Sequence, residues 1–474
     1  MSKSKKIRIT FCGQNATDVT GSCTHIQTEH NQILIECGLY QSCSPAIDDY
    51  KVNSEKLPYK PKEITYIFAL HNHIDHIGKL PLLYKKGCQA KIIAPINSKG
   101  IAEILLRDCA HINGKDSESF SRISGKDYKP LFTDEDVDTC LSYWCEFPFD
   151  EKIELDENVT FNLSHSGHIL NSSQLELWLK NKNTTKKIAY TSDIGNISIP
   201  KYYAQELTKI KKCDLLIAES TYCGEKSHFD FNRRDKEMIK IKDTIESVCI
   251  EKGGRILFPV FANDRCQNIL TCIYDIFGND PHFNIPVLVD SPMAVKICQE
   301  YKRILDGEDA KKIQSVLSWN NLVLVSDYAT SKVYQDSNEP LIILSASGMM
   351  QAGRSVNWAT NLLPNANNFI MFCGFAPEES LAGRIKNDKI KSLKIGKKTV
   401  NNKCGICSLK SFSSHIQRED MLEYYSGVNA EKIALVHGDF KDKCEFANDL
   451  QEVIGEKDKT TKVIVINKDM EVLL

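Results

Sequence analysis

Four side chains that commonly bind metal ions crowd into the motif HNHIDH, residues 71–76. His71 and His73 are two residues apart, so an extended segment lets both reach one ion from the same side. Asp75 and His76 follow where the chain turns towards a helix, and they would point at a neighbouring position. Since one ion cannot readily take four ligands from so short a segment, we favour two adjacent ions; this motif alone also leaves open a structural site or a chance cluster.

Imidazole and carboxylate ligands together suit zinc or a similar first-row metal. Two such ions about 3.5–4 Å apart can activate a water molecule and stabilise both oxygens of a phosphoryl displacement. Three more candidate ligands occur later in the chain, His168 in SGHILNSS, Asp193 in YTSDIGN and His437 in ALVHGD. Together they complete a set of seven.

The elements that must position these residues are short apolar runs, each ending at a polar residue. The runs and their polar residues are TYIFAL before His71, NVTFNLSHSG before His168, KKIAYTS before Asp193, CDLLIA before Glu219, LKSFSS before His415 and KIALV before His437. Their length and β-branched content are typical of buried strands. Helical patterns such as GKLPLLYKKG and NSKGIAEILLRDCA lie between some of them, which favours an α/β fold with functional residues at strand carboxyl ends.

The middle of the chain has its own alternation of strand and helix patterns, from GGRILFPVFA to PLIILSASG, and we expect it to form an inserted domain. The expected boundaries are 1–210 for the first part of the outer domain, 211–385 for the insertion and 386–474 for the remainder of the outer domain. The stretch 383–403 carries eight Lys or Arg and one Asp. It is either a solvated loop or a positive track for nucleic acid.

The totals are ordinary for a globular protein of two or three domains: 474 residues, 42% hydrophobic, 26% charged and a formal net charge of −2. This net charge neither demands nor excludes a nucleic-acid partner. The beginning of the sequence lacks the apolar stretch of a signal peptide, and no apolar run is long enough for a membrane span. The 18 cysteines are scattered. We therefore expect a soluble cytoplasmic protein with reduced thiols, including the pair Cys404 and Cys407.

The ordered motifs HNHIDH, SGHILNS and TSDIGN resemble those of the metallo-β-lactamase superfamily. LLIAESTYCG, SFSSHIQRED and ALVHGDF resemble its β-CASP branch, whose members process nucleic acids. The resemblance extends over almost the whole chain and includes DVTGSC, FPVFANDRCQ, VLVDSPMA, SASGMMQAGR and GFAPEESLAGRI. It implies a metallo-β-lactamase αββα sandwich with an inserted α/β β-CASP domain, and an RNA-specificity segment within 386–474.

The resemblance also implies roles for individual residues. One zinc ion would be held by His71, His73 and His168, and a second by Asp75, His76 and His437, with Asp193 bridging both. A hydroxide between the metals would attack the phosphorus, and Asp75 would help to orient it. His415 would contact the scissile phosphate or protonate the leaving oxygen, and Glu219 would hold that imidazole.

Histidine at position 437 is the form that the resemblance associates with RNA-processing members, whereas DNA-specialised relatives commonly carry valine. Two positions depart from the family pattern. Glu36 replaces an aspartate that would support a zinc ligand, and Gln417 replaces an aspartate two residues after His415. We expect these departures to affect the rate and not the reaction class.

Five residues are candidates for substrate contact: Arg265, Ser347, Gly348, Arg354 and Arg384. Arginine matches phosphate bidentately, and the small residues of SASGMMQAGR can present backbone N–H groups, although a plain turn explains them nearly as well. The remaining histidines are expected to be structural or at the surface: His25, His30, His111, His165, His228 and His282.

These features predict a zinc-dependent ribonuclease with two Zn²⁺ per chain acting on single-stranded RNA. A DNA nuclease, a small-ester hydrolase of the same fold and a non-catalytic scaffold subunit are the alternatives. Internal or terminal cleavage, the RNA target, and a homodimer or membership of an RNA-processing complex are left open.

Overall fold

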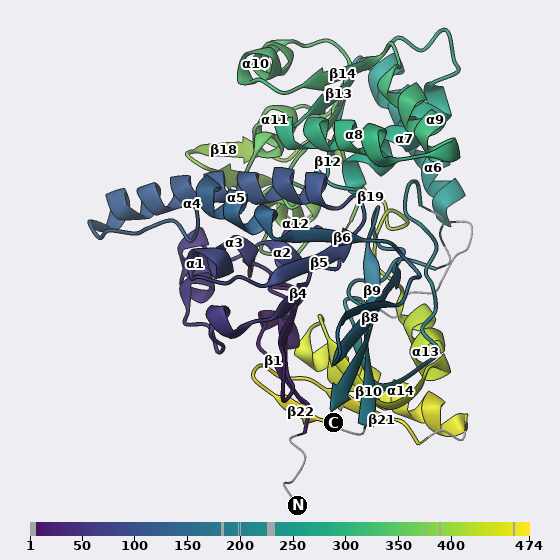
Figure 1. Ribbon diagram of the computed structural model, residues 1–474. Coiled ribbons are helices and arrows are strands. Elements are labelled where there is room, and N and C mark those ends of the chain that lie inside the picture. Colours follow the sequence, from purple (N-terminus) through teal and green to yellow (C-terminus); the bar gives the residue numbers. More distant parts are fainter. Residues whose placement is uncertain are drawn as a thin grey trace, which may run out of the picture. The chain divides into compact units, whose positions relative to one another are not determined.

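The computed structural model describes residues 6–181, 184–197, 199, 201–224, 233–374, 376–387, 390–457 and 460–474. The chain divides into two compact units (Figure 1). Unit 1 holds the described residues within 1–198, 204–229 and 414–474, and unit 2 holds those within 199–203 and 230–413. One unit is thus inserted into the other in sequence, as expected.

Unit 1 contains two seven-stranded sheets. The first has the order β22-β1-β2-β3-β4-β5-β6 and the second β21-β20-β11-β10-β9-β8-β7. The strands of the first sheet are β1 (Arg8–Phe11), β2 (Thr24–Gln27), β3 (Gln32–Ile35), β4 (Tyr66–Phe68), β5 (Lys91–Pro95), β6 (Trp144–Phe147) and β22 (Glu471–Leu473). The strands of the second sheet are β7 (Ile153–Asp156), β8 (Val159–His165), β9 (Ser173–Asn181), β10 (Thr184–Tyr190), β11 (Lys212–Glu219), β20 (Asn429–Val436) and β21 (Lys462–Val465).

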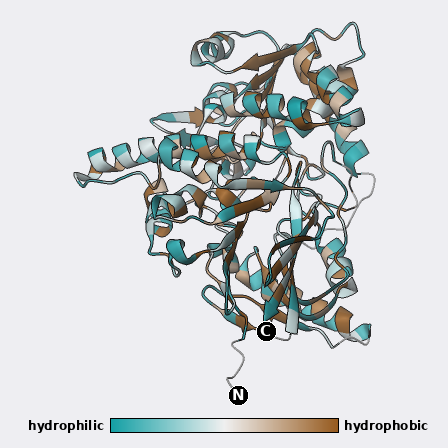
Figure 2. Cartoon of the chain, viewed as in Figure 1, coloured by the Kyte–Doolittle hydropathy of each residue, from teal (hydrophilic) through white to brown (hydrophobic). Residues whose placement is uncertain are grey.

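Helices cover the outer faces of these two sheets. The helices of unit 1 are α1 (Ala46–Ser54), α2 (Ile74–Ile77), α3 (Leu80–Lys85), α4 (Lys99–Ser124), α5 (Asp134–Ser142), α13 (Arg418–Gly427) and α14 (Phe440–Glu456). Apolar residues of the two sheets, such as Phe68 and Leu177, share one core. A second core joins the first sheet to α3, α4 and α5, and a third joins the second sheet to α13 and α14. Figure 2 shows β4 and β5 as strongly hydrophobic ribbons. Unit 1 is therefore an αββα sandwich, the expected fold.

Unit 2 is built on a six-stranded sheet with the order β14-β13-β15-β12-β16-β19, in which every pairing is parallel. Its strands are β12 (Arg255–Pro259), β13 (Val287–Asp290), β14 (Leu322–Val325), β15 (Leu341–Ser345), β16 (Phe369–Phe372) and β19 (Gly405–Ser408), beside a hairpin of β17 (Ser392–Ile395) and β18 (Lys398–Asn401). Its α-helices are α6 (Arg233–Ile245), α7 (Arg265–Phe277), α8 (Pro292–Ile304), α9 (Gly307–Leu317), α10 (Tyr328–Asp336), α11 (Arg354–Leu362) and α12 (Leu381–Lys386). The central strands β12, β13 and β15 are buried throughout, as is typical of parallel sheets, whereas the edge strands β14 and β19 are partly exposed.

The boundaries of the units differ from those expected from the sequence. Strand β11 lies after position 211 but pairs with β10 and β20, so it belongs to unit 1. Strand β19 lies after position 385 but pairs with β16, so unit 2 continues to residue 413. Pairing between distant strands sets both boundaries, and a local pattern does not reveal it.

Five of the six runs that precede a polar site residue form strands, namely β4, β8, β10, β11 and β20. The interpretation of LKSFSS as a strand is wrong, because β19 ends at Ser408 and the segment to His415 consists of turns. Its hydrogen bonds go elsewhere: the backbone N–H groups of Lys410 and Ser411 donate to the Glu237 carboxylate.

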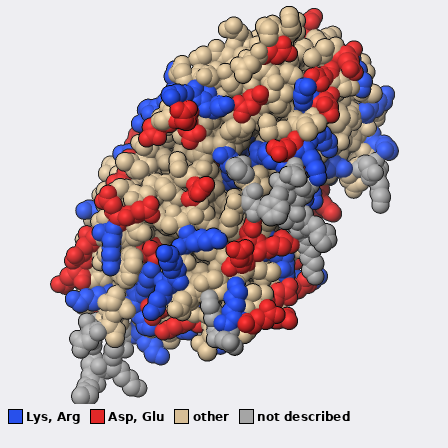
Figure 3. All heavy atoms as spheres, turned by 90° about the vertical axis from the view of Figure 1, so that its right-hand side faces the viewer, with Lys and Arg blue, Asp and Glu red and all other residues tan. Residues whose placement is uncertain are grey.

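Other expectations concern surface and cysteine chemistry. Figure 3 shows acidic and basic side chains intermixed over one face, in keeping with the small net charge. All eighteen cysteines are free thiols. Among the described residues, no helix is both long and apolar enough to cross a membrane.

Candidate metal centre

The seven predicted ligands gather at one edge of the two sheets of unit 1. His71 and His73 follow β4, and Asp75 and His76 lie on the single-turn helix α2. His168 lies in the loop from β8 to β9, while Asp193 and His437 follow the ends of β10 and β20. Because β10, β11 and β20 are parallel neighbours, their carboxyl ends meet at the same edge.

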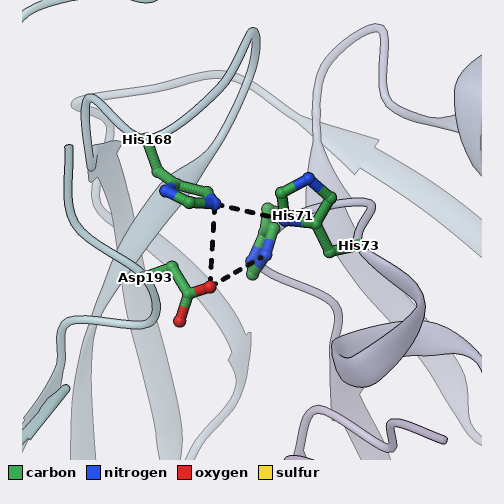
Figure 4. Close-up of side chains that lie close together, drawn as sticks. All are labelled: His71, His73, His168 and Asp193. Atoms are coloured by element: carbon green, nitrogen blue, oxygen red, sulfur yellow. Dashed lines mark hydrogen bonds and ion pairs between the residues drawn. The ribbon is translucent and has the colours of Figure 1, made fainter. Parts of the chain in front are cut away.

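A first group of donors surrounds the Asp193 carboxylate (Figure 4). Its Oδ2 lies 3.6 Å from His71 Nε2 and 3.6 Å from His168 Nε2. His168 Nε2 is in turn 3.1 Å from His73 Nδ1. The four side chains point towards one another, so their donor atoms converge on one position.

A second group, formed by Asp75, His76 and His437, adjoins the first. Asp75 Oδ2 lies 3.5 Å from His76 Nε2 and 3.6 Å from His437 Nε2. The Asp193 carboxylate also reaches this group, with its Oδ2 3.3 Å from His76 Nε2 and its Oδ1 3.5 Å from His437 Nδ1. Asp193 therefore lies within reach of both groups.

These spacings fit metal coordination better than hydrogen bonding. Donors about 2.0–2.1 Å from a tetrahedral zinc ion are about 3.3–3.4 Å apart, close to the separations within both groups. Within the described residues, no hydrogen bond reaches the buried Nε2 atoms of His71, His76 and His437 or Oδ1 of Asp193. Buried polar atoms are normally satisfied, so the donor set fits a metal ion that completes their interactions.

The opposite nitrogens of four histidines are each anchored. His71 Nδ1 lies 3.1 Å from Ser192 Oγ, and His76 Nδ1 lies 2.8 Å from Glu36 Oε2. Similarly, His168 Nδ1 donates to the Ser414 carbonyl at 3.1 Å, and His437 Nδ1 lies 2.9 Å from Thr221 Oγ1. Such partners fix ring orientation and tautomer, leaving Nε2 directed at the metal positions.

Glu36 contacts residues of both donor groups on the side away from the expected metal positions. Its side chain is fully buried. One carboxylate oxygen accepts a hydrogen bond from Ser192 Oγ at 2.6 Å, and the other accepts from Ser22 Oγ at 2.5 Å and Tyr190 OH at 3.2 Å. Since Ser192 contacts His71 while Glu36 contacts His76 directly, one glutamate supports both groups. This is the supporting position expected from the sequence.

The surroundings shift the pKa values of the buried imidazoles in different directions. Burial lowers the pKa of His71 and of His168 well below the ordinary value, which favours neutral imidazoles, the form that can bind a metal. Burial also disfavours the charged form of His76, but the Asp193 and Glu36 carboxylates outweigh it and hold the pKa of His76 well above the ordinary value. A proton on His76 thus balances carboxylate charge that a metal cation would otherwise balance.

Glu219 and His415 form a pair beside the centre. His415 Nδ1 lies 3.2 Å from Glu219 Oε1, which also accepts from the Ile194 N–H at 2.7 Å. Thr221 Oγ1 donates to Glu219 Oε2 at 2.5 Å, linking this pair to His437. The His415 ring centroid is 4.6 Å from that of His168 and its side chain is 20% exposed, so it borders both the metal ligands and solvent.

Gln417, where the family pattern has aspartate, donates from Nε2 to the His415 carbonyl at 3.3 Å. It therefore braces the backbone of the histidine segment without adding negative charge. The departure affects the position of His415 and not the metal ligands.

The loop that carries His437 is held by the amino-terminal part of the chain. The His437 N–H donates to the Asn15 carbonyl at 2.6 Å, and the Gly438 N–H to the Asp18 carbonyl at 3.1 Å. A Cβ on Gly438 would lie 2.4 Å from the Ser220 carbonyl oxygen, so only glycine fits there. The buried Lys443 ammonium donates to the carbonyls of Ala16 and Ile466 and closes this junction.

The five candidate substrate-contact residues all lie in unit 2, and the structure uses them differently. Arg354 donates from Nη1 to Asp290 Oδ1 at 2.6 Å and from Nη2 to the Ser326 carbonyl at 2.9 Å, so it serves the fold. Arg265 donates to the Cys373 carbonyl, and Ser347 Oγ to the Ala352 carbonyl at 3.4 Å. Gly348 borders a surface pocket together with Arg265, and Arg384 is half-buried on α12.

The basic stretch 383–403 also belongs to unit 2. Its described part includes α12 and the β17–β18 hairpin, on which Leu393 and Val400 enter the core. Lys391, Lys394 and Lys398 are exposed. The lysines thus occupy the outer side of an ordered hairpin.

The histidines without an assigned role lie outside the metal groups. His25 is buried beside Gln32, His165 stacks on Phe149 with ring centroids 3.8 Å apart, and His30, His111 and His282 are exposed. His228 lies outside the described residues. Sequence reasoning missed the hydroxyl groups of Ser22, Ser192 and Thr221, although all three lie within motifs that it used.

Comparisons with known proteins agree with this geometry. Residues 266–385 match the Beta-Casp domain, and residues 399–465 match the Zn-dependent metallo-hydrolase RNA specificity domain. The chain is 26% identical to "Transcription termination factor FttA" of Methanocaldococcus jannaschii over 471 residues, covering 95% of this chain and 70% of that protein. It is 25% identical to "Ribonuclease TTHA0252" of Thermus thermophilus over 430 residues, covering 90% and 91%.

A third relative, "Integrator complex subunit 11" of Danio rerio, is 23% identical over 452 residues, covering 94% of this chain and 71% of that protein. Among solved structures, a protein of unknown function from Enterococcus faecalis shares the fold, with a TM-score of 0.57, 12% identity and coverage of 99% and 100%. Two parts of the chain therefore match the Beta-Casp domain and the Zn-dependent metallo-hydrolase RNA specificity domain, and most of the chain is similar to a protein named as a ribonuclease.

Proposed function

We propose that this protein is a ribonuclease that uses two zinc ions to hydrolyse phosphodiester bonds of single-stranded RNA. The observation that carries the proposal is the pair of adjoining donor groups that share Asp193. In the proposal, His71, His73 and His168 hold one ion, Asp75, His76 and His437 hold the other, and Asp193 bridges them. Unit 1 would be the metallo-β-lactamase domain and unit 2 the β-CASP domain.

The bound ions would supply a Lewis acid for the phosphoryl oxygens and water of lowered pKa, both of which promote phosphodiester hydrolysis. The protein's own groups do the remaining work. In this proposal Asp75, on the short helix α2, orients the attacking water. His415 donates a proton to the leaving oxygen, and Glu219, which also binds the Ile194 N–H, keeps that imidazole in position.

RNA as the substrate is supported by the matched RNA specificity domain and by the relative named as a ribonuclease. One relative is named as a subunit of a complex, and this supports the further proposal that the protein acts within an RNA-processing assembly. A mass measurement of the purified protein in solution distinguishes a homodimer from a monomer.

The test uses purified zinc-loaded protein with an end-labelled single-stranded RNA, beside DNA of the same sequence. The control is the double variant Asp75→Ala, His76→Ala, with bound zinc measured for both proteins. We expect RNA fragments only with the unaltered protein, and their lengths distinguish internal from terminal attack. Preferential cleavage of DNA, or no cleavage of either strand with two zinc ions bound, would overturn the proposal.

A further inference from the structure

Phe261 is an exposed aromatic residue within an otherwise buried segment of unit 2. Its side chain is 41% exposed, whereas its neighbours Val260 and Ala262 are 1% and 6% exposed. The segment is held firmly: the Phe261 carbonyl accepts from the Cys266 N–H at 3.1 Å, and the Ala262 carbonyl accepts from Gln267 Nε2 at 3.1 Å. These hydrogen bonds fix the backbone in a conformation that leaves the Phe261 ring exposed to solvent.

The ring lies at the topological switch point of the six-stranded parallel sheet. From β12 the chain passes through α7 to β13, which lies beyond β15. From β15 it passes in the opposite direction through α11 to β16, which lies beyond β12. Helix α7 accordingly packs on β15 and α11 on β12. In open parallel sheets, ligands bind outside the carboxyl ends of the two strands at which this reversal occurs.

The segments that follow β12 and β15, together with the segment after the neighbouring strand β16, line a small pocket. Phe261 and Arg265 come from the segment after β12, Gly348 from the segment after β15, and Gly374 from the segment after β16. A Cβ on Gly348 would lie 3.4 Å from the Cδ2 and Cε2 atoms of the Phe261 ring. The absence of a side chain at position 348 thus leaves the ring uncovered on this side.

Two cations lie at this pocket, Arg265 in its lining and Lys386 at the Gly374 turn. Arg265 donates from Nη1 to the Cys373 carbonyl, and Lys386 Nζ donates to the Gly374 carbonyl at 3.0 Å. A Cβ on Gly374 would lie 2.6 Å from Arg265 Nη1, so glycine is needed where the two cations approach the same turn. An exposed aromatic ring beside fixed cations suits a flat, apolar group joined to an anion.

We propose that Phe261, framed by Gly348, is a stacking site for a nucleobase of single-stranded RNA, with Arg265 and Lys386 beside the flanking phosphate. This inference rests on the proposed function. Bases of a single strand are free to stack on aromatic side chains, and such stacking tolerates any base because each has a π-face. The site therefore adds affinity without sequence preference.

The test compares steady-state cleavage of single-stranded RNA by the zinc-loaded protein and by Phe261→Ala, Phe261→Trp and Gly348→Val. Base stacking on an aromatic side chain corresponds to about 5- to 150-fold in affinity. We expect Phe261→Ala and Gly348→Val to raise KM within this range, and Phe261→Trp to keep KM near the unaltered value. Tyr328→Ala, which removes a 64% exposed aromatic side chain from the same unit, is the matched control and should leave KM unchanged.

An RNA series with a single abasic nucleotide at successive positions identifies the stacked base. At one position the abasic RNA should raise the KM of the unaltered protein but not the KM of Phe261→Ala. Equal KM values for the unaltered protein and Phe261→Ala, or equal abasic penalties in both, would overturn the inference while RNA cleavage upholds the proposed function. If the unaltered protein leaves RNA intact, the proposed function fails, and fluorescence anisotropy with the same uncut RNA then tests the stacking site alone; equal binding by Phe261→Ala, or no binding, overturns it.

Discussion

The two units expose very different groups at the carboxyl ends of their parallel strands. In unit 1 the edge formed by β10, β11 and β20 carries Asp193, Glu219 and His437, all almost fully buried. In unit 2 the edge formed by β12 and β15 carries an exposed phenylalanine and a glycine. The same position in a sheet thus serves ionic chemistry in one unit and an apolar surface in the other.

The two edges also differ in how their buried ionisable groups are stabilised. Buried carboxylates and imidazoles are costly to desolvate unless each is paired, and several donor atoms of unit 1 lack a hydrogen bond among the described residues. We therefore expect unit 1 to depend on bound metal for part of its stability, since a ligand that binds only the folded state stabilises it. In unit 2 the buried carboxylate of Asp290, at the end of β13, is paired with Arg354, Ser331 and Trp358.

The largest expected effect comes from comparing alanine variants of Asp193 in unit 1 and Asp290 in unit 2. Asp193→Ala should abolish RNA cleavage and reduce bound zinc, because this carboxylate contacts both donor groups; the loss should exceed the about 10- to 100-fold that a supporting residue costs. Asp290→Ala should destabilise unit 2 and leave the zinc content unchanged. Elemental analysis together with cleavage rates checks both. Full zinc occupancy in Asp193→Ala would contradict the expectation that only the edge of unit 1 depends on metal.

His415→Ala should lower kcat by about 10²- to 10⁴-fold, the usual contribution of a general acid, while both zinc ions stay bound. Glu219→Gln removes the charge that holds the imidazole and should cause a smaller loss. Single-turnover cleavage with measured metal content separates these effects from loss of metal. An unchanged rate in His415→Ala would assign the proton transfer to another group of unit 1.

Arg354→Met asks whether this arginine serves the fold of unit 2 or the substrate. Its removal leaves Asp290 buried without its cation, which costs about 3–5 kcal/mol, and urea denaturation should show the loss. The double variant Arg354→Met, Asp290→Asn should regain part of that stability. A rise in KM for RNA without any change in stability would instead support a phosphate contact.

Glu36→Gln should produce the smallest of these effects. The variant keeps the size of the side chain but weakens the charged contact to His76, so zinc affinity should fall by about 10- to 100-fold. Tyr190→Phe removes only one hydrogen bond to the same carboxylate and should have little effect on zinc affinity. Competition with a fluorescent chelator measures both. Equal affinities in Glu36→Gln and the unaltered protein would mean that the hydroxyl groups alone position the histidines.

Much of unit 1 could be predicted because its chemistry and its strands are local in sequence. His71, His73, Asp75 and His76 lie in one motif, and the apolar runs before His168, Asp193 and His437 form β8, β10 and β20. The grouping of donors around Asp193 in the structure follows the ligand sets that the resemblance implied.

The remaining features depend on contacts between distant residues. Position 385 is not a unit boundary because β19 pairs with β16, and LKSFSS is not a strand because its N–H groups bind Glu237. The Asp290 carboxylate that binds Arg354 lies in another element of unit 2, so the sequence does not reveal this ion pair. Phe261 reads as part of a buried run, and only the backbone turn after β12 exposes it.

The attachment of the His437 loop to Asn15 has a consequence for the order in which the protein is made. The first metal ligands emerge from the ribosome early, but His437 emerges only after the whole of unit 2, and β22 then pairs with β1. A nascent chain therefore exposes a partial ligand set beside the messenger that encodes it, without the residue that completes the second group. In the proposed ribonuclease, the second donor group would therefore be completed only after unit 2 has been synthesised.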